Sequence, residues 1–277
     1  MRAVKGTGQK EMSLLSDIER KAKKTHARIG LGIGRVSEDL IMSAEDATKY
    51  AEVVLVGDEK QISATGTRLE IIHSTEPSKK LVELLVGEDI DGAVRGTLSA
   101  TKTLSLLKSS LGMKKLYRAA LLETADRTPF FLAPVGIDEG NSIEDKIELI
   151  KRGVEHIQRL EAEARVGILS GGRFEDKGRD KTVDRTLEEA QIVTERLCGM
   201  GMNAKNYSIL IEEAIKEANF IIAPDGISGN LIFRTLVFLG GGHGYGAPVL
   251  MNKVFVDTSR VKEDAARAIM LASALVE

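Results

Sequence analysis

The chain has 277 residues, of which 43% are hydrophobic and 29% charged, so it can bury a core of its own without a disulfide or a structural metal. Its formal net charge of −2, the absence of tryptophan and an aromatic content of 4% argue against a nucleic-acid surface. Cys198 is the only cysteine, and no apolar run approaches the ~20 residues of a membrane span. We therefore expect a cytoplasmic protein with neither nucleic acid nor membrane as a partner.

Short apolar runs without polar alternation predict strands that are covered on both faces. They fall at 27–34, 52–57, 69–73, 91–96, 117–123, 129–134, 165–172, 220–226 and 248–257. Patterns with three- and four-residue spacing predict helices at 77–87, 142–164, 184–198 and 263–276. This alternation predicts an α/β protein with mostly parallel sheets. Nine strand candidates are many for one open sheet, so two α/β lobes are favoured.

Two of the predicted helices carry end signals. Ser142 is followed three residues later by Asp145, which is close to a capping box and predicts that Ser142 caps the helix. Gly87 follows an apolar helical pattern and is predicted to end it in the left-handed conformation.

The stretch "IIAPDGISGNLIFRTL" at 221–236 passes from a predicted strand to a predicted helix. Gly226 and Gly229 would let the backbone turn with positive φ and let a ligand approach, and Ser228 or Asn230 could cap the helix. The free N–H groups of a helix start attract anions. The stretch therefore predicts either a phosphate or carboxylate site or a simple tight turn.

Three other strand-to-helix junctions combine an arginine with hydroxyls or glycines. They contribute Arg95, Gly96 and Thr97, then Ser170, Gly171 and Arg173, and finally Asp257, Ser259 and Arg260. Ligands of parallel α/β sheets bind at the carboxyl ends of the strands, and a guanidinium matches two oxygens of a phosphate or carboxylate. We therefore expect these junctions to converge with the 221–236 stretch on one site for a small anionic molecule.

Motifs for tightly bound cofactors and metals are missing from the sequence. Gly30, Gly32 and Gly34 resemble a dinucleotide-binding loop, but Arg35 stands where its third glycine belongs. There is no phosphate-loop lysine motif and no paired-histidine motif. We therefore expect no metal and no tightly bound cofactor.

The order of several motifs resembles the phosphate acetyl/butyryltransferase family over roughly residues 45 to 277. The motifs comprise Pro224, Gly229, Asn230, Phe233 and Arg234, a glycine-rich "GGGHGYG", and then Pro248, Ser259 and Arg260. "DGAVRGTLSAT" and "VGILSGG" are similar to two further strand ends of the family. The closest likeness is to a divergent branch of the family that occurs in methanogens.

The resemblance implies two α/β lobes with a cleft between them, a fold shared with isocitrate and isopropylmalate dehydrogenases. It implies one lobe from residues 1–128 with 251–277, and a second from 129–250. It also implies a homodimer that transfers an acyl group between coenzyme A and phosphate, which would be substrates. In the family, the residue at Arg260 contacts phosphate and charge at the carbonyl, and the one at Ser259 assists by hydrogen bonding. Glu263 or Asp264 would be the base toward the thiol, and we select Asp264.

The chain also departs from the family pattern. Ala119 and Ala120 lie near the place where many members have serine and histidine, and Arg234 replaces a lysine. These changes leave two alternatives open. The chain could be a non-enzymatic or regulatory protein associated with methyltransferase components, or a methyltransferase subunit itself.

Overall fold

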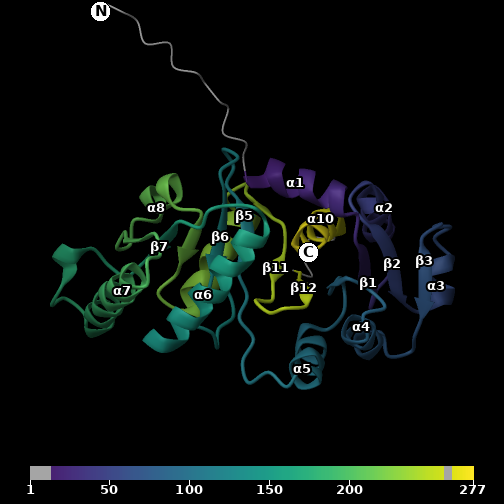
Figure 1. Ribbon diagram of the computed structural model, residues 1–277, viewed down its shortest axis with the longest axis horizontal. Coiled ribbons are helices and arrows are strands. Elements are labelled where there is room, and N and C mark those ends of the chain that lie inside the picture. The colour runs from purple at the N-terminus through teal and green to yellow at the C-terminus, as the bar shows by residue number, and fades with distance from the viewer. Residues whose placement is uncertain (1–13, 259–263) are drawn as a thin grey trace, which may run out of the picture.

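The computed structural model describes residues 14–258 and 264–277, which form two α/β lobes side by side along the long axis of the molecule (Figure 1). Each lobe is built on a six-stranded sheet. The predicted fold class is confirmed. No helix within the described ranges has both the length and the apolar content that crossing a membrane requires.

The first sheet is parallel except for one edge strand. Its order is β11 (Ala247–Pro248), β12 (Val254–Asp257), β4 (Gly92–Val94), β1 (Arg28–Gly32), β2 (Glu52–Gly57) and β3 (Glu70–His73). Only β11 runs antiparallel to its neighbour. β4 and β12 are buried along their whole length, as a strand covered by helices on both faces requires.

The second sheet is mixed, with three parallel and two antiparallel strand pairings. Its order is β10 (His243–Gly244), β5 (Ala120–Glu123), β6 (Pro129–Ala133), β9 (Phe220–Ile222), β7 (Val166–Ile168) and β8 (Ala204–Asn206). The parallel part runs from β6 to β8, and β10 and β5 form the antiparallel side. The chain enters the second lobe at β5 and leaves it after β10, so both crossings between the lobes are on this antiparallel side.

Helices cover both sheets. The first lobe has α1 (Leu14–Thr25), α2 (Glu38–Asp46), η1 (Ala47–Lys49), α3 (Glu59–Ser63), α4 (Pro77–Val86), α5 (Ala100–Ser110) and α10 (Ala265–Leu275). The second has α6 (Ile143–Arg159), η2 (Phe174–Asp176), α7 (Lys181–Gly199), α8 (Ile211–Glu217) and α9 (Gly226–Phe238). α10 is apolar nearly all round and packs against α1, α2 and β4, so it is the central helix of the first lobe.

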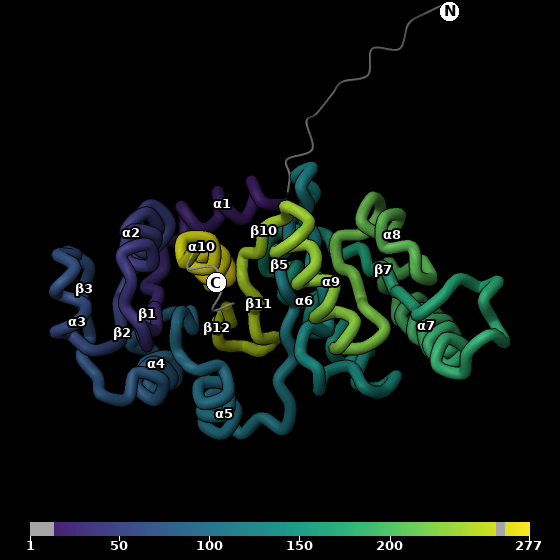
Figure 2. The backbone as a smooth tube through the Cα atoms, turned by 180° about the vertical axis from the view of Figure 1, so that it is seen from behind, coloured from purple at the N-terminus to yellow at the C-terminus, as the bar shows by residue number. Residues whose placement is uncertain are grey.

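α9 and α10 flank the region in which the candidate site lies. Figure 2 shows them on the same face of the molecule, with β10 and β11 between them. α10 follows the carboxyl end of β12 in the first lobe, and α9 follows β9 in the second. A pocket between these helices therefore draws on both lobes.

The predicted helix ends had mixed outcomes. Ser142 does cap α6, because its side chain accepts a hydrogen bond from the Asp145 backbone N–H at 3.1 Å. The left-handed Gly87 was wrong: its φ is −76°, and the positive φ of 65° belongs to Glu88. The turn is therefore completed one residue later than the glycine indicated.

Sheet membership differs from the predicted lobe boundaries at 128/129 and 250/251. β5 lies within the range 1–128, yet it pairs with β6 of the second sheet. β11 lies within 129–250, yet it pairs with β12 of the first. The physical reason is the antiparallel hairpin of β5 and β6: hydrogen bonding keeps these neighbouring strands in one sheet.

Candidate functional site

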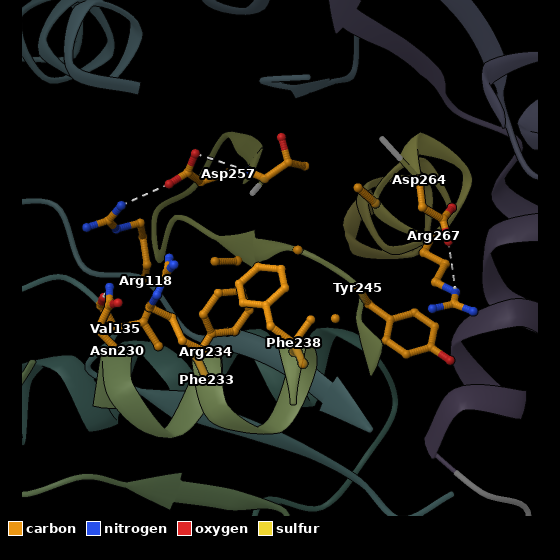
Figure 3. Close-up of a pocket in the computed structure, with 17 residues that line it drawn as sticks. Arg118, Val135, Asn230, Phe233, Arg234, Phe238, Tyr245, Asp257, Asp264 and Arg267 are labelled. Carbon is orange, nitrogen blue, oxygen red and sulfur yellow. Dashed lines mark hydrogen bonds and ion pairs between the residues drawn. The ribbon is translucent and has the colours of Figure 1, made fainter. Parts of the chain in front are cut away.

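A pocket of about 190 Å³ lies where the two lobes meet. Its walls come from α9, β5 and β10 of the second lobe and from β11, the end of β12 and the start of α10 of the first. Arg118, Asn230 and Arg234 lie on one side of it, and Tyr245 and Arg267 lie on the other (Figure 3). The pocket therefore has two distinct ends.

The end with Arg118 is built on a network of charges. The Arg118 guanidinium donates from Nε to Glu139 at 2.8 Å and from Nη1 to Asp257 Oδ2 at 2.8 Å. Asp257 Oδ1 in turn accepts from Arg95 Nε. Burial by itself would lower the pKa of Arg118, but the two carboxylates raise it, so the guanidinium stays charged. Two cations and two anions balance in this network.

Arg234 and Asn230 add to this end from α9. Within the described parts of the chain, no carboxylate forms an ion pair with Arg234; its guanidinium carbon lies 5.2 Å from the centre of the Phe238 ring. The Asn230 side-chain amide donates to the Val135 carbonyl at 3.0 Å, which fixes its orientation. Counting the described residues alone, Arg234 therefore leaves this end of the pocket with one positive charge in excess.

The wall between the two ends is apolar. Phe233 and Phe238 pack edge to face, with ring centres 6.0 Å apart and planes at 81°. Ala120, Val237 and Ala247 line the pocket beside them. This wall suits a hydrocarbon group next to the positive end.

The far end is closed by Tyr245. Its hydroxyl donates to Glu123 Oε2 at 3.1 Å, and burial, followed by the Glu123 charge, raises the pKa of Tyr245 to about 12. The Arg267 guanidinium carbon lies 5.3 Å from the centre of the Tyr245 ring, and its Nε lies 3.3 Å from Asp264 Oδ2. Tyr245 is therefore neutral at physiological pH and held from two sides.

The glycines at the start of α9 have a different role from the predicted one. Neither Gly226 nor Gly229 has a positive φ. A Cβ at Gly226 would lie 1.7 Å from the Gly136 carbonyl oxygen, and one at Gly229 would lie 1.9 Å from that of Pro134. The helix cap is Asp225, whose Oδ1 accepts from a backbone N–H at 2.8 Å. The predicted caps Ser228 and Asn230 were wrong, and the helix start faces protein backbone.

Arg95 is a structural residue in this fold. It is only 3% exposed, and besides Asp257 it donates from Nη1 to the Leu98 carbonyl at 2.6 Å. The Gly96 carbonyl accepts from the Thr258 hydroxyl at 3.0 Å, which ties the junction to the end of β12. The Thr97 hydroxyl accepts two backbone N–H groups of the loop after β1, each at 3.0 Å. Asp257 and Thr258 line the pocket, whereas Arg95, Gly96 and Thr97 do not, so this junction supports the pocket from behind.

The junction after β7 does not reach the pocket. The Ser170 hydroxyl donates to the Gly172 carbonyl at 2.9 Å, and the Gly171 N–H donates to the Thr186 hydroxyl at 2.9 Å. Arg173 is exposed, and its backbone N–H donates to Asp176. These residues lead into α7, which lies at the far end of the second lobe in Figure 1.

Of the residues expected at the site, Asn230, Arg234, Asp257 and Asp264 line the pocket. Ser259 and Arg260 lie outside the described residues, between Thr258 and Asp264, both of which line it. No group of three or more metal-ligating side chains occurs among the residues that the structure describes.

Sequence reasoning missed Arg118, Phe238, Tyr245 and Arg267. Arg118 is the second residue of the predicted strand 117–123, and Tyr245 lies in the glycine-rich "GGGHGYG". A charged residue in a predicted strand and an aromatic residue among glycines were therefore the signals that could have found them. Nothing in the sequence indicated that Arg267, in the first turn of a buried helix, faces Tyr245.

Comparisons with known proteins identify relatives of the chain. No family model matches the chain. It is 59% identical over 266 residues, 95% of each chain, to a Methanosarcina acetivorans protein named "Putative methyltransferase mtx subunit X". It is 24% identical over 187 residues to a phosphate acetyltransferase of Rickettsia typhi, covering 61% of this chain and 54% of that one.

The solved structures show the fold. The phosphotransacetylase EutD from Staphylococcus aureus superimposes with a TM-score of 0.70 at 18% identity, covering 95% of this chain and 98% of that one. A 4-hydroxythreonine-4-phosphate dehydrogenase from Klebsiella pneumoniae gives 0.64 at 11% identity, covering 91% and 100%. The phosphotransacetylase-like fold expected from the motifs is confirmed, and the chain belongs to the family of proteins named "Putative methyltransferase mtx subunit X".

Proposed function

We propose that this protein is an acyltransferase that binds a small anionic acyl compound between its lobes and moves the acyl group between coenzyme A and phosphate. The observation that supports this most is the pocket itself, in which Arg118 and Arg234 stand at one end of an apolar wall. Guanidinium groups match phosphate and carboxylate oxygens, and the wall of Phe233 and Phe238 fits an acyl chain. The phosphotransacetylase-like fold supports the same reaction class.

The proposed chemistry is attack of a phosphate oxygen on the carbonyl carbon of an acyl thioester. The carbon–sulfur bond breaks, and its electron pair leaves with the sulfur, which then takes up a proton. Arg234 would hold the phosphate and the developing negative charge, an effect worth about 3 kcal/mol for one such donor. We propose Ser259 and Arg260 for contacts with the carbonyl and phosphate. Asp264, the base expected from the resemblance, lies beside Arg267 at the Tyr245 end of the pocket, so no proton transfer at sulfur is proposed for it.

The size of the pocket limits how coenzyme A could bind. A volume of about 190 Å³ holds only the reactive end of such a molecule together with a short acyl group. The rest of the coenzyme would lie outside the pocket.

The test is turnover by the full chain. Purified protein is incubated with a panel of acyl-coenzyme A compounds and phosphate, and the released thiol is measured. We expect release with at least one acyl group, and a fall of about 100-fold in kcat/KM for Arg234→Gln. Arg185→Gln, which changes an exposed arginine on α7, is the matched control and should leave the rate unchanged. Absence of thiol release with every compound would count against the proposal.

A second candidate function follows from the printed name of the relatives, which describes a methyltransferase subunit. The chain would then serve a methyltransferase system as a regulatory or accessory component. α9 exposes Ile227 at 61% and Leu231 at 60%, which is an apolar surface beside the pocket. Purification from native cells would distinguish the two cases: stable recovery with methyltransferase components favours this candidate.

We also propose that the protein forms a homodimer. Sedimentation of the pure protein tests this.

A further inference from the structure

Tyr245 stands between the pocket and a second cavity. The second cavity has a volume of about 500 Å³ and shares Tyr245, Asp264 and Arg267 with the pocket. Its other walls come from α1, the end of α2 and the segment around Glu123 and Arg127. The side chains of Tyr245, Asp264 and Arg267 therefore lie between the smaller pocket and the larger cavity.

This separating wall is fixed in place. Tyr245 is 8% exposed, and the Glu123 carboxylate that accepts its hydroxyl is itself 4% exposed and paired with Arg127 at 3.2 Å. The guanidinium of Arg267 lies over the ring from the other side. A buried side chain with a hydrogen bond and a packed ring face does not move aside at little cost.

The pocket has a direction. Its cationic end with Arg118 and Arg234 lies on the side opposite Tyr245, and the rings of Phe233 and Phe238 lie between (Figure 3). An anionic head group at the arginines therefore places its hydrocarbon tail along the two phenylalanines. The end of that tail points toward Tyr245.

We propose that Tyr245 determines substrate length: it stops the hydrocarbon tail of the ligand and restricts the pocket to short acyl groups. The inference rests on the proposed function, because it places the carboxyl or phosphate end at the arginines. A dry apolar cavity of 150 Å³ holds a benzene-sized group, so about 190 Å³ admits a tail of similar size and a small head group. A longer tail would have to pass Tyr245 into the second cavity.

A substitution at Gly244 provides an independent way to change the length of hydrocarbon tail that the pocket accepts. A Cβ at Gly244 would lie 3.6 Å from Phe233 Cε2 and 3.7 Å from Val237 Cγ2, which is ordinary contact distance. Alanine therefore fits without strain and adds one methyl group against the aromatic wall. Gly244→Ala should shorten the accepted tail, whereas removal of the Tyr245 ring should lengthen it.

The experiment is calorimetric titration of the full chain with straight-chain carboxylates from acetate to decanoate, which share one charge and differ only in length. For the unmodified protein we expect the dissociation constant to fall about fourfold per methylene, up to a break beyond which it rises. Tyr245→Ala should move the break to longer acids by at least two carbons, and Gly244→Ala should move it to shorter ones. Tyr245→Phe keeps the ring and should keep the break.

Thermal unfolding checks that each variant is folded, and Tyr245→Leu replaces Tyr245→Ala if the alanine variant is not. An unmoved break in the folded variant that lacks the ring overturns the inference, and so does the absence of any break in the unmodified protein. Lack of carboxylate binding also overturns it. The acyl-transfer proposal is judged separately, by thiol release. If thiol is released but Tyr245→Ala does not move the break in chain length, only the inference about Tyr245 fails.

Discussion

Replacing Gly229 by alanine should destabilise the protein and weaken ligand binding together. The added Cβ would lie 1.9 Å from the Pro134 carbonyl oxygen, whereas ordinary contact begins at 3.4 Å, so the two backbones must separate by about 1.5 Å. The obstructing atom belongs to the backbone and cannot rotate away. Overpacking of this kind costs about 1–3 kcal/mol, and we expect the upper part of that range.

The same displacement should reach the pocket. Asn230, the next residue on α9, donates to the Val135 carbonyl at 3.0 Å, and a separation of about 1.5 Å would break this hydrogen bond. Arg234 lies one turn further along the same helix and would move with it. We therefore expect weaker binding of small carboxylates in addition to lower stability.

Urea unfolding followed by circular dichroism measures the first effect. Gly199→Ala is the matched control, because no atom lies within 4 Å of the Cβ it would add, and alanine in a helix is about 1 kcal/mol more favourable than glycine. Gly229→Ala should lower the urea midpoint, and Gly199→Ala should leave it unchanged or raise it. Equal midpoints for the two variants would refute the close-packing explanation.

Two further predictions concern buried charge. Asp257→Asn should lower the free energy of unfolding by about 3 kcal/mol, because it leaves the buried Arg95 without its carboxylate; Glu217→Gln, at an exposed ion pair, should change the urea midpoint little. His156 is buried, and burial, followed by the charge of Arg159, lowers its pKa to about 4. The stability that the neutral imidazole contributes is fully present above the unfolded pKa of about 6.5 and is lost as the pH falls toward 4. The free energy of unfolding, measured with urea, should therefore fall by about 2 kcal/mol between pH 7.5 and 5. His156→Gln should not show this loss.

The strands could be predicted well because their signal is local. Each of the nine apolar runs contains a strand, since a strand covered on both faces needs apolar residues at consecutive positions. β8 and β10 were missed because they have two or three residues and include polar or glycine positions, as in Ala204–Asn206, and β11 because it has only two residues. Such strands form because a neighbouring strand is present, which a single run of sequence does not show.

The site was harder to predict because its pairs are distant in the sequence. From its sequence neighbours Arg95 is predicted to bind an anion, but in the structure its guanidinium donates to Asp257, 162 residues away. The separation between Arg118 and Asp257 is 139 residues. Local patterns identify an arginine at a strand end, but which carboxylate it meets depends on how the sheets are assembled.

The glycines of the 221–236 stretch show both a local signal and a distant contact. Gly226 and Gly229 were expected to turn the backbone with positive φ and to let a ligand approach, but they have no positive φ, and the group that comes close is the chain's own backbone at Pro134 and Gly136. That close approach holds α9 against the segment that follows β6, and the same helix presents Asn230 and Arg234 to the pocket. The same glycines can therefore matter for an anion site without touching the anion, since they set the position of the helix that carries its ligands.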